Sequence, residues 1–269
     1  MLNADVEQTA QSVRRVPVRA ASVWMWLARV VFPALVLAIW QYLSNHRILS
    51  PLFVGDPIGI VASLWDGIVV THGMLEDLGW TLLGTVLAFA LGSIAGIATG
   101  LVFSVYGWLE RFAEPYLAAL NSLPRIALAP LFILWLGLGL TSKVAAGFSL
   151  TFFILLGSTV AGTRSVDPDL VTLARTLGAR PAEVFLRVIL PSAVPTIFAG
   201  LRLGLIYALL GVVAAEIMGA EHGLGQSVSY LANTFQTNGL FAVLVLLAAV
   251  GGGLSWFMSA LEARLLVWR

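Results

Sequence analysis

Six long apolar runs constrain this chain more than any other feature of its sequence. A bilayer core about 30 Å thick is crossed by a helix of about 20 apolar residues. Such a segment must satisfy its backbone hydrogen bonds internally, which a helix does. We therefore predict six transmembrane helices. They are expected over residues 24–43, 79–103, 113–138, 144–162, 196–218 and 240–266.

Composition indicates that the solvent of these helices is lipid. Hydrophobic residues make up 59% of the chain and charged residues 11%, with a mean hydropathy of +0.94. That is too little polar surface to cover a soluble globule. We predict an all-α integral membrane protein in contact with the bilayer, with a polar tail over residues 1–23 and one transmembrane domain over residues 24–269. The tail carries no cleavage site of the kind that ends a signal peptide.

Basic residues are distributed unevenly between the two sides of this arrangement. With both termini in the cytoplasm, the outside holds only Arg47 and Lys143. Because positive charge collects on the cytoplasmic side, we predict this orientation, with one long cytoplasmic loop over residues 164–195. The predicted inner residues are Arg14, Arg15, Arg19, Arg111, Arg164, Arg175, Arg180, Arg187, Arg264 and Arg269.

Several kinds of chemistry have no motif in the chain. It contains no cysteine and three scattered histidines, so no metal site is expected. It lacks a phosphate-binding GxxxxGK[ST] loop, and its only lysine, Lys143, is predicted on the outer side. The net charge of +1 gives no reason to expect a nucleic-acid partner. We expect no enzyme activity and no ATP hydrolysis by this chain alone.

The second run carries a stripe of small residues at a spacing of four. Small residues at this spacing let helix backbones approach closely in membranes. Close packing is the simpler interpretation, and a surface that slides during transport is the alternative. The stripe consists of Gly84, Ala88, Gly92, Gly96 and Gly100.

The long cytoplasmic loop predicts a pair of short helices. Asp167 is suited to cap a first helix and Pro168 to occupy its first position. This helix is expected to reach Leu177, with Gly178 as its left-handed end. An exposed helix pair with an apolar face fits a groove on a partner. The alternative is a pair that rests on lipid headgroups.

A second short helix is predicted to open at Pro181. Glu183 lies in its first turn, where a carboxylate is favourable. Pro191 and Pro195 are expected to break the chain before the fifth span.

The loop resembles the EAA loop of bacterial ATP-binding-cassette (ABC) importer permeases. That pattern is Glu-Ala-Ala, three residues, Gly, nine residues, Ile, one residue and Leu-Pro. The spacing is kept here, but Thr172 replaces the acidic residue and Leu173 the first alanine, so a salt bridge by that acid is in doubt. The residues expected to contact the ATPase are Asp169, Thr172, Leu173, Ala174, Leu177, Gly178, Val188, Leu190 and Pro191.

Two further stretches, Asn121–Gly139 and Ala215–Gly225, are similar to segments of the nitrate, sulfonate, taurine and bicarbonate permeases. The resemblance implies a type I ABC importer permease fold in a bacterial inner membrane and a small, anionic solute. It implies three partners: a peripheral ATPase dimer that binds ATP and Mg, an extracytoplasmic solute-binding protein, and a second copy of this chain.

The third run contains a candidate substrate pathway. Pro124 and Pro130 each remove a backbone hydrogen bond and predict that the helix is kinked or unwound, as helices that line membrane cavities often are. Arg125 lies about 16 Å of helical rise beyond Glu114, near the middle of the membrane, where a charge is costly. We expect Arg125 to face the pathway and attract an anion, and the alternative is a structural pair or snorkelling. The proposed pathway residues are Asn121, Ser122, Pro124 and Arg125.

Glu216 is predicted near the outer end of the fifth run, and Glu221 in the loop that follows it. They are expected to contribute to the docking face for the binding protein, and a solvated turn is the alternative. Two other classes of function remain open from the sequence. They are a secondary transporter or channel, and a non-transporting membrane scaffold.

Overall fold

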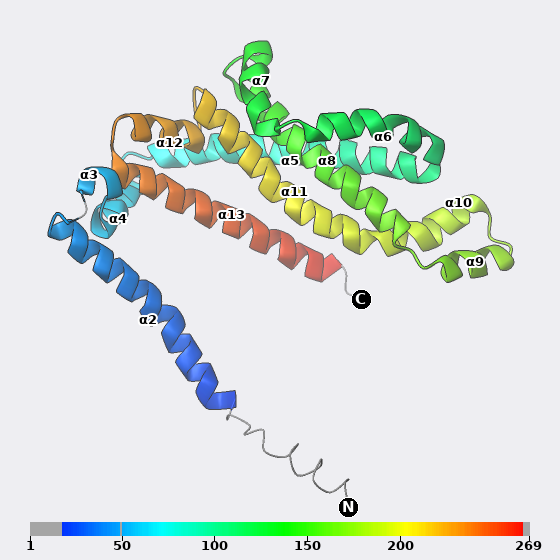
Figure 1. The fold of residues 1–269 in the computed structure, drawn as a ribbon, viewed down its shortest axis with the longest axis horizontal. Coiled ribbons are helices and arrows are strands. Elements are labelled where there is room, and N and C mark those ends of the chain that lie inside the picture. The colour runs from blue at the N-terminus through cyan, green and yellow to red at the C-terminus, as the bar shows by residue number, and fades with distance from the viewer. Residues whose placement is uncertain (1–17, 49, 266–269) are drawn as a thin grey trace, which may run out of the picture. The chain divides into compact units, whose positions relative to one another are not determined.

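The computed structural model describes residues 18–48 and 50–265. The chain divides into two compact units, Met1–Gly59 and Ile60–Arg269. The described residues are helical apart from short connections, and no strand occurs among them (Figure 1). The prediction of an all-α membrane protein is confirmed.

The first unit contains one long helix followed by short ones. Helix α2 covers the first predicted span and begins at Val18, within the range predicted as a tail; residues 1–17 lie outside the described residues. In its last turn, the Ser44 hydroxyl donates to the Gly55 carbonyl at 3.1 Å. The elements are α2 (Val18–Asn45), α3 (Pro51–Val54) and the start of α4 (Pro57–Trp65).

The second unit contains the remaining spans. Among the described residues, four helical segments are long and apolar enough to cross a bilayer, and a bent pair makes a fifth. The first predicted run is covered by α2 of the first unit. The elements after α4 are η1 (Asp66–Val70), α5 (Gly73–Val105), α6 (Gly107–Ser122), η2 (Arg125–Leu128), α7 (Ala129–Leu136), α8 (Leu140–Arg164), α9 (Pro168–Thr176), α10 (Pro181–Val184), η3 (Phe185–Ile189), α11 (Leu190–Met218), α12 (Leu224–Asn233) and α13 (Thr237–Leu265).

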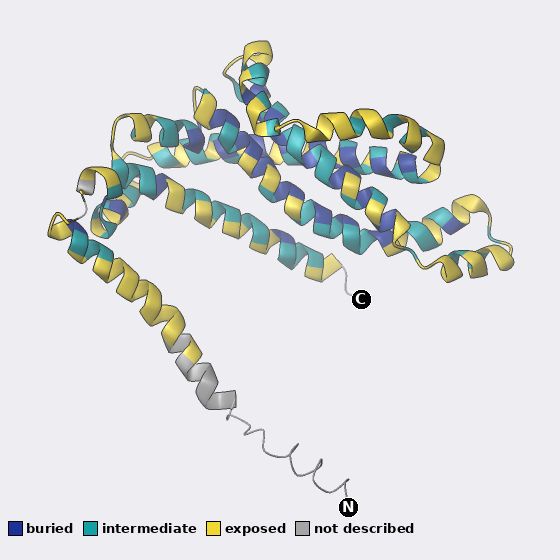
Figure 2. Ribbon diagram, viewed as in Figure 1, coloured by how far each residue is buried: buried dark blue, intermediate teal, exposed yellow. Residues whose placement is uncertain are grey.

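The core of this unit lies where α5, α8 and α11 pack together (Figure 2). Glycines on α5 meet side chains and backbone of α8 directly: a Cβ built on Gly96 would lie 2.6 Å from the Phe152 carbonyl oxygen. Thr151 on α8 donates to the Gly204 carbonyl of α11 at 3.2 Å. The small-residue stripe of the sequence is therefore a packing surface.

The third predicted span is broken at Pro124, which is the unwinding that its prolines predict as the alternative to a kink. Helix α6 ends at Ser122, and α6 and the η2–α7 segment are bent by 82°. Leu123 and Pro124 between them are extended, with ψ of 134° and 94°. A residue before proline is driven out of the helical region, because the proline ring clashes with its backbone. The estimate of the depth of Arg125 assumed a continuous helix and no longer applies.

The predicted break before the fifth span is wrong. One helical segment runs from Pro181 to Met218. The π-helical η3 makes this possible, because its wider turn joins the Leu190 N–H to the Phe185 carbonyl, five residues back. Pro191 follows this wider turn directly, so the N–H that proline lacks is missing where the register of the hydrogen bonds already changes. The loop predicted over residues 164–195 is thus continuous with the fifth apolar helix.

We predict that Gly96→Ala destabilises the protein by about 1–3 kcal/mol, because the added Cβ must push against the α8 backbone. Gly79→Ala on the same helix is the matched control, since a Cβ there meets nothing within 4 Å. Thermal unfolding in detergent measures both. Equal melting temperatures for the two variants would contradict the packing assignment.

Candidate functional site

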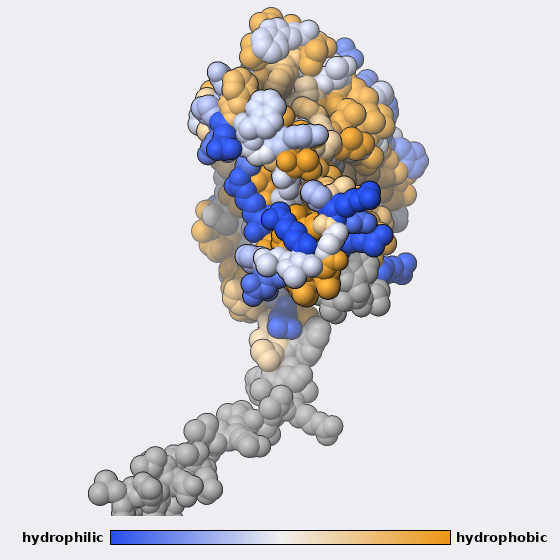
Figure 3. All heavy atoms as spheres, turned by 90° about the vertical axis from the view of Figure 1, so that its right-hand side faces the viewer, coloured by the Kyte–Doolittle hydropathy of each residue, from blue (hydrophilic) through white to orange (hydrophobic). Residues whose placement is uncertain are grey.

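The coupling hairpin, residues 165–189, comprises α9, its following turn, α10 and η3. Asp167 caps α9, since its Oδ1 accepts the Asp169 N–H at 2.9 Å, and Pro168 takes the first position. Both predicted roles are confirmed. The hairpin lies at one end of the unit, where hydrophilic side chains gather (Figure 3). We call this end the hairpin end.

Gly178 ends α9 as the sequence predicted. Its φ of +85° is left-handed. The Gly178 N–H donates to the Arg175 carbonyl at 2.9 Å, and the Ala179 N–H donates to the Ala174 carbonyl at 3.1 Å. This pair of bonds is the Schellman motif, which satisfies carbonyls that a helix end leaves free. The turn therefore depends on a residue that adopts positive φ without strain.

The second helix of the hairpin begins at Pro181 as predicted. The Glu183 carboxylate accepts the Arg180 N–H at 2.8 Å and so anchors the start of α10. A cavity of about 350 Å³ lies between the two parts of the hairpin. It is lined by Ala174, Leu177, Gly178, Ala179, Glu183, Val184, Arg187 and Val188.

Apolar side chains of the hairpin face outward. Leu173 and Leu177 are 56% and 79% exposed, and Leu186 is 60% exposed. Thr172, at the position of the usual acid, donates its hydroxyl to the Pro168 carbonyl at 2.9 Å within its own helix. Its side chain offers no carboxylate to a partner, whereas the apolar face remains available. Val188 lies in η3, and Leu190 and Pro191 begin α11.

The proposed pathway residues meet at the break between α6 and η2. Arg125 donates to the Asn121 side-chain oxygen, and its guanidinium carbon lies 4.2 Å from the centre of the Phe153 ring. Its buried Nε has no hydrogen-bond partner. The Ser122 hydroxyl instead donates to the Ala119 carbonyl of its own helix at 2.7 Å.

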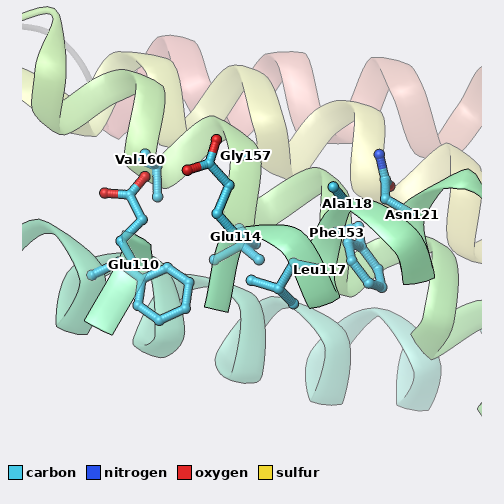
Figure 4. Close-up of a pocket in the computed structure, with 10 residues that line it drawn as sticks. Glu110, Glu114, Leu117, Ala118, Asn121, Phe153, Gly157 and Val160 are labelled. Carbon is cyan, nitrogen blue, oxygen red and sulfur yellow. The ribbon is translucent and has the colours of Figure 1, made fainter. Parts of the chain in front are cut away.

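Two cavities adjoin this break. One of about 390 Å³ is lined by Asn121, Pro124 and Arg125 with neighbouring apolar residues. The other, of about 260 Å³, lies between α6 and α8, where Glu110, Glu114 and Asn121 follow one another along α6 (Figure 4). Glu110 pairs with Arg164 at 2.6 Å. Asn121 lines both cavities, so polar groups extend along α6 from the hairpin end to Arg125.

Glu216 does not lie on a surface. Its side chain is fully buried and pairs with Lys143 at 3.2 Å. The alternative of a solvated turn is therefore wrong for Glu216. In this structure the Glu216 side chain is also not exposed to a docking partner. Glu221 is exposed on the following loop. Lys143 is itself buried, which sequence reasoning missed by assigning it to an outer loop. The sequence held a signal for this pair. Lys143 and Glu216 each lie at the end of an apolar run, where a charge needs a partner.

Comparison with known proteins defines the class of this chain. Residues 89–267 match the family described as "Binding-protein-dependent transport system inner membrane component". The chain belongs to this family, and it is the multi-pass permease subunit of an ABC importer. Such subunits carry out the transport step, and ATP hydrolysis takes place on a separate chain. The family implies an ATPase and a binding protein as partners.

Individual relatives cover almost the whole chain. SsuC of Bacillus subtilis, provisionally named an aliphatic sulfonates transport permease protein, is 33% identical over 97% of this chain and 93% of its own. The taurine transport system permease protein TauC of Escherichia coli is 32% identical over 87% of each chain. The riboflavin transport system permease protein RibX of Chloroflexus aurantiacus is 32% identical over 97% of this chain and 98% of its own.

A solved structure supports the fold. The inward-facing MetNI methionine ABC transporter matches with a TM-score of 0.63 at 20% identity, over 72% of this chain and 96% of that chain. The type I importer permease fold is therefore confirmed.

We predict that Gly178→Val weakens the complex between this permease and its ATPase. Positive φ costs a non-glycine residue about 1–2 kcal/mol, and a β-branched side chain suffers most. No atom lies within 4 Å of a Cβ built there, so the effect isolates backbone strain from steric clash. Gly178→Asn is the matched control, because asparagine tolerates this conformation. Co-purification of the ATPase measures the effect, and equal yields for both variants would refute it.

Proposed function

We propose that this permease imports a small organic anion of the sulfonate class. The observation that carries the proposal is Arg125, a half-buried cation at the break of a membrane span, with one N–H unpartnered. A guanidinium binds planar or branched oxyanions through several parallel hydrogen bonds. Relatives at 32–33% identity carry names for aliphatic sulfonates and taurine, which agrees with such a solute.

Two contacts support a binding role for Arg125. Asn121 and the Phe153 ring hold its guanidinium from two sides, so little side-chain entropy remains to be lost when an anion binds. Neither contact neutralises the positive charge. No carboxylate among the described residues pairs with Arg125, and an ionisable residue inside a membrane span is a candidate for a functional role.

The coupling hairpin is the proposed seat for the ATPase dimer, which would bind ATP and Mg. Its exposed leucines fit a groove on that partner. ATP binding closes the ATPases, and the hairpin moves with them as a rigid lever that switches the pathway between inward and outward access. Asp169, Leu173 and Leu177 lie on the α9 part of that lever.

We place the hairpin end in the cytoplasm of a bacterial cell, with both termini on that side of the inner membrane. Arg175, Arg180 and Arg187 are exposed at this end, as the positive-inside rule requires. The opposite end, with α12 and Glu221, would then receive the binding protein.

A second copy of the chain would complete the pathway. Helix α6 buries none of its side chains within its own bundle, and Phe112 and Tyr116 are each 63% exposed. A symmetric pair of permeases would cover such surfaces around a central path.

We predict that Arg125→Gln raises the KM for taurine uptake by about 10- to 100-fold, since a charge-assisted hydrogen bond contributes about 1.5–3 kcal/mol. Uptake of labelled taurine into proteoliposomes that contain the ATPase and are supplied with the binding protein measures it. Arg125→Lys keeps the charge without the planar fork and should give an intermediate KM.

Ser122→Ala is the second control, because that hydroxyl bonds its own helix; its KM should match that of the wild type. An unchanged KM and unchanged solute-stimulated ATPase activity in Arg125→Gln would remove Arg125 from the pathway. Uptake of riboflavin without uptake of taurine would replace the anionic solute with a neutral ring system, as the name of RibX suggests.

A further inference from the structure

The buried ion pair of Lys143 and Glu216 joins two membrane spans at the end opposite the hairpin. Lys143 lies in the first turn of α8 and Glu216 in the last turn of α11. Each charge is disfavoured by the dipole of its own helix, and each is favoured by the end of the neighbouring antiparallel helix. A buried ion pair is weak evidence for stability. Its contacts indicate another role.

These contacts fix the start of α12 from outside that helix. Residue Gly223 precedes α12 and has no side chain to cap it. Four successive backbone groups are instead bound by side chains of α5, α8 and α11. The Lys143 ammonium donates to the His222 carbonyl, Asp77 accepts the Gly223 N–H at 2.9 Å, Thr81 accepts the Leu224 N–H at 2.9 Å, and Glu216 accepts the Gly225 N–H at 2.9 Å.

Glu216 accepts one further hydrogen bond, from Thr81. The Thr81 hydroxyl lies 3.1 and 2.9 Å from the two carboxylate oxygens, so its single proton is shared between them. Above the cluster, the rings of Trp80 and His222 stack with centres 5.4 Å apart. Every polar group of the pair therefore has a partner in α5 or in the α12 turn, which we define as residues 219–225.

Two glycines make this arrangement possible. A Cβ built on Gly223 would lie 2.1 Å from a Glu216 carboxylate oxygen, and one built on Gly225 would lie 2.5 Å from the Val213 carbonyl oxygen. Gly223 also has a φ of +121°. The α12 turn thus approaches Glu216 as closely as backbone can.

Glu216 and the coupling hairpin lie on the same continuous helix. The segment Pro181–Met218 has 38 residues, or about 57 Å of helical rise. Its first residues form part of the hairpin, and its last turn carries Glu216. This helix therefore connects the hairpin directly to the residue that binds the α12 turn.

We propose that Lys143 and Glu216 are positioning residues for transport, which fasten the α12 turn to α8 and α11 so that the two ends of the permease move together. The proposal rests on the proposed function in one respect, that the α12 end receives the binding protein. Loss of the pair would then leave α12 attached through Asp77 and Thr81 but no longer driven by α11.

The test uses the double variant Lys143→Met with Glu216→Gln in the purified complex with the ATPase. Neutralising both residues avoids a lone buried charge, and the glutamine oxygen can still accept a hydrogen bond. Hydrogen exchange of the α12 turn is measured without nucleotide and with ATP and vanadate. We expect nucleotide to change exchange at this turn in the wild type and to leave it unchanged in the variant. Stimulation of the ATPase by taurine-loaded binding protein should fall by about fivefold or more.

The matched control is Arg202→Met with Glu262→Gln, which removes the ion pair between α11 and α13 at 3.5 Å. It should behave as the wild type in both measurements. A nucleotide response that persists in the variant of Lys143 and Glu216 overturns the proposal. Loss of assembly with the ATPase in this variant also overturns it, because the role of the ion pair is then structural. The exchange measurement needs no solute, so it tests this proposal whatever solute the permease imports. An error in the proposed solute class would appear only in the uptake of taurine by the wild type.

Discussion

The close approach of α5, α8 and α11 is the contact on which the rest of the structure depends. In lipid there is no hydrophobic force to bring helices together, so packing and a few hydrogen bonds must suffice. Glycines at positions 92, 96 and 100 of α5 let it meet α8 without intervening side chains. Thr151 then bridges α8 to α11 by bonding the Gly204 carbonyl. These three helices form the frame that carries both functional ends.

The two ends of this frame differ in which side chains they expose and which they bury. At the hairpin end, polar caps and a Schellman turn hold short helices in shape while their leucines stay exposed for a partner. At the α12 end, charged groups are buried, and each is satisfied by backbone or hydroxyl groups of a neighbour. The helix Pro181–Met218 connects the ends without interruption. The π-helical turn is what allows it to pass Pro191.

Local sequence rules predicted the elements that local chemistry controls. The α9 helix, from its Asp167 cap to Gly178, was predicted closely because its boundaries depend on hydrogen bonds within a few residues. The third span was predicted as one segment, although Pro124 breaks it outright. The continuity of the fifth span was not predicted. A π turn changes the register of the backbone hydrogen bonds, and no residue type is diagnostic of it. Lys143 and Glu216 lie 73 positions apart, so their pairing could not be read from spacing.

By itself, the sequence determined that the chain is a bundle of membrane helices, where most of them lie, and that its cytoplasmic loop has the spacing of an importer coupling loop. Periodicity, caps and hydropathy are local properties, and lipid leaves a chain few alternatives to the helix. Only the tertiary structure decided that α12 begins without a cap of its own. Its first N–H groups are satisfied by Asp77, Thr81 and Glu216 from other helices. Only the packing of α5 and α11 against the α12 turn brings these groups within hydrogen-bond distance.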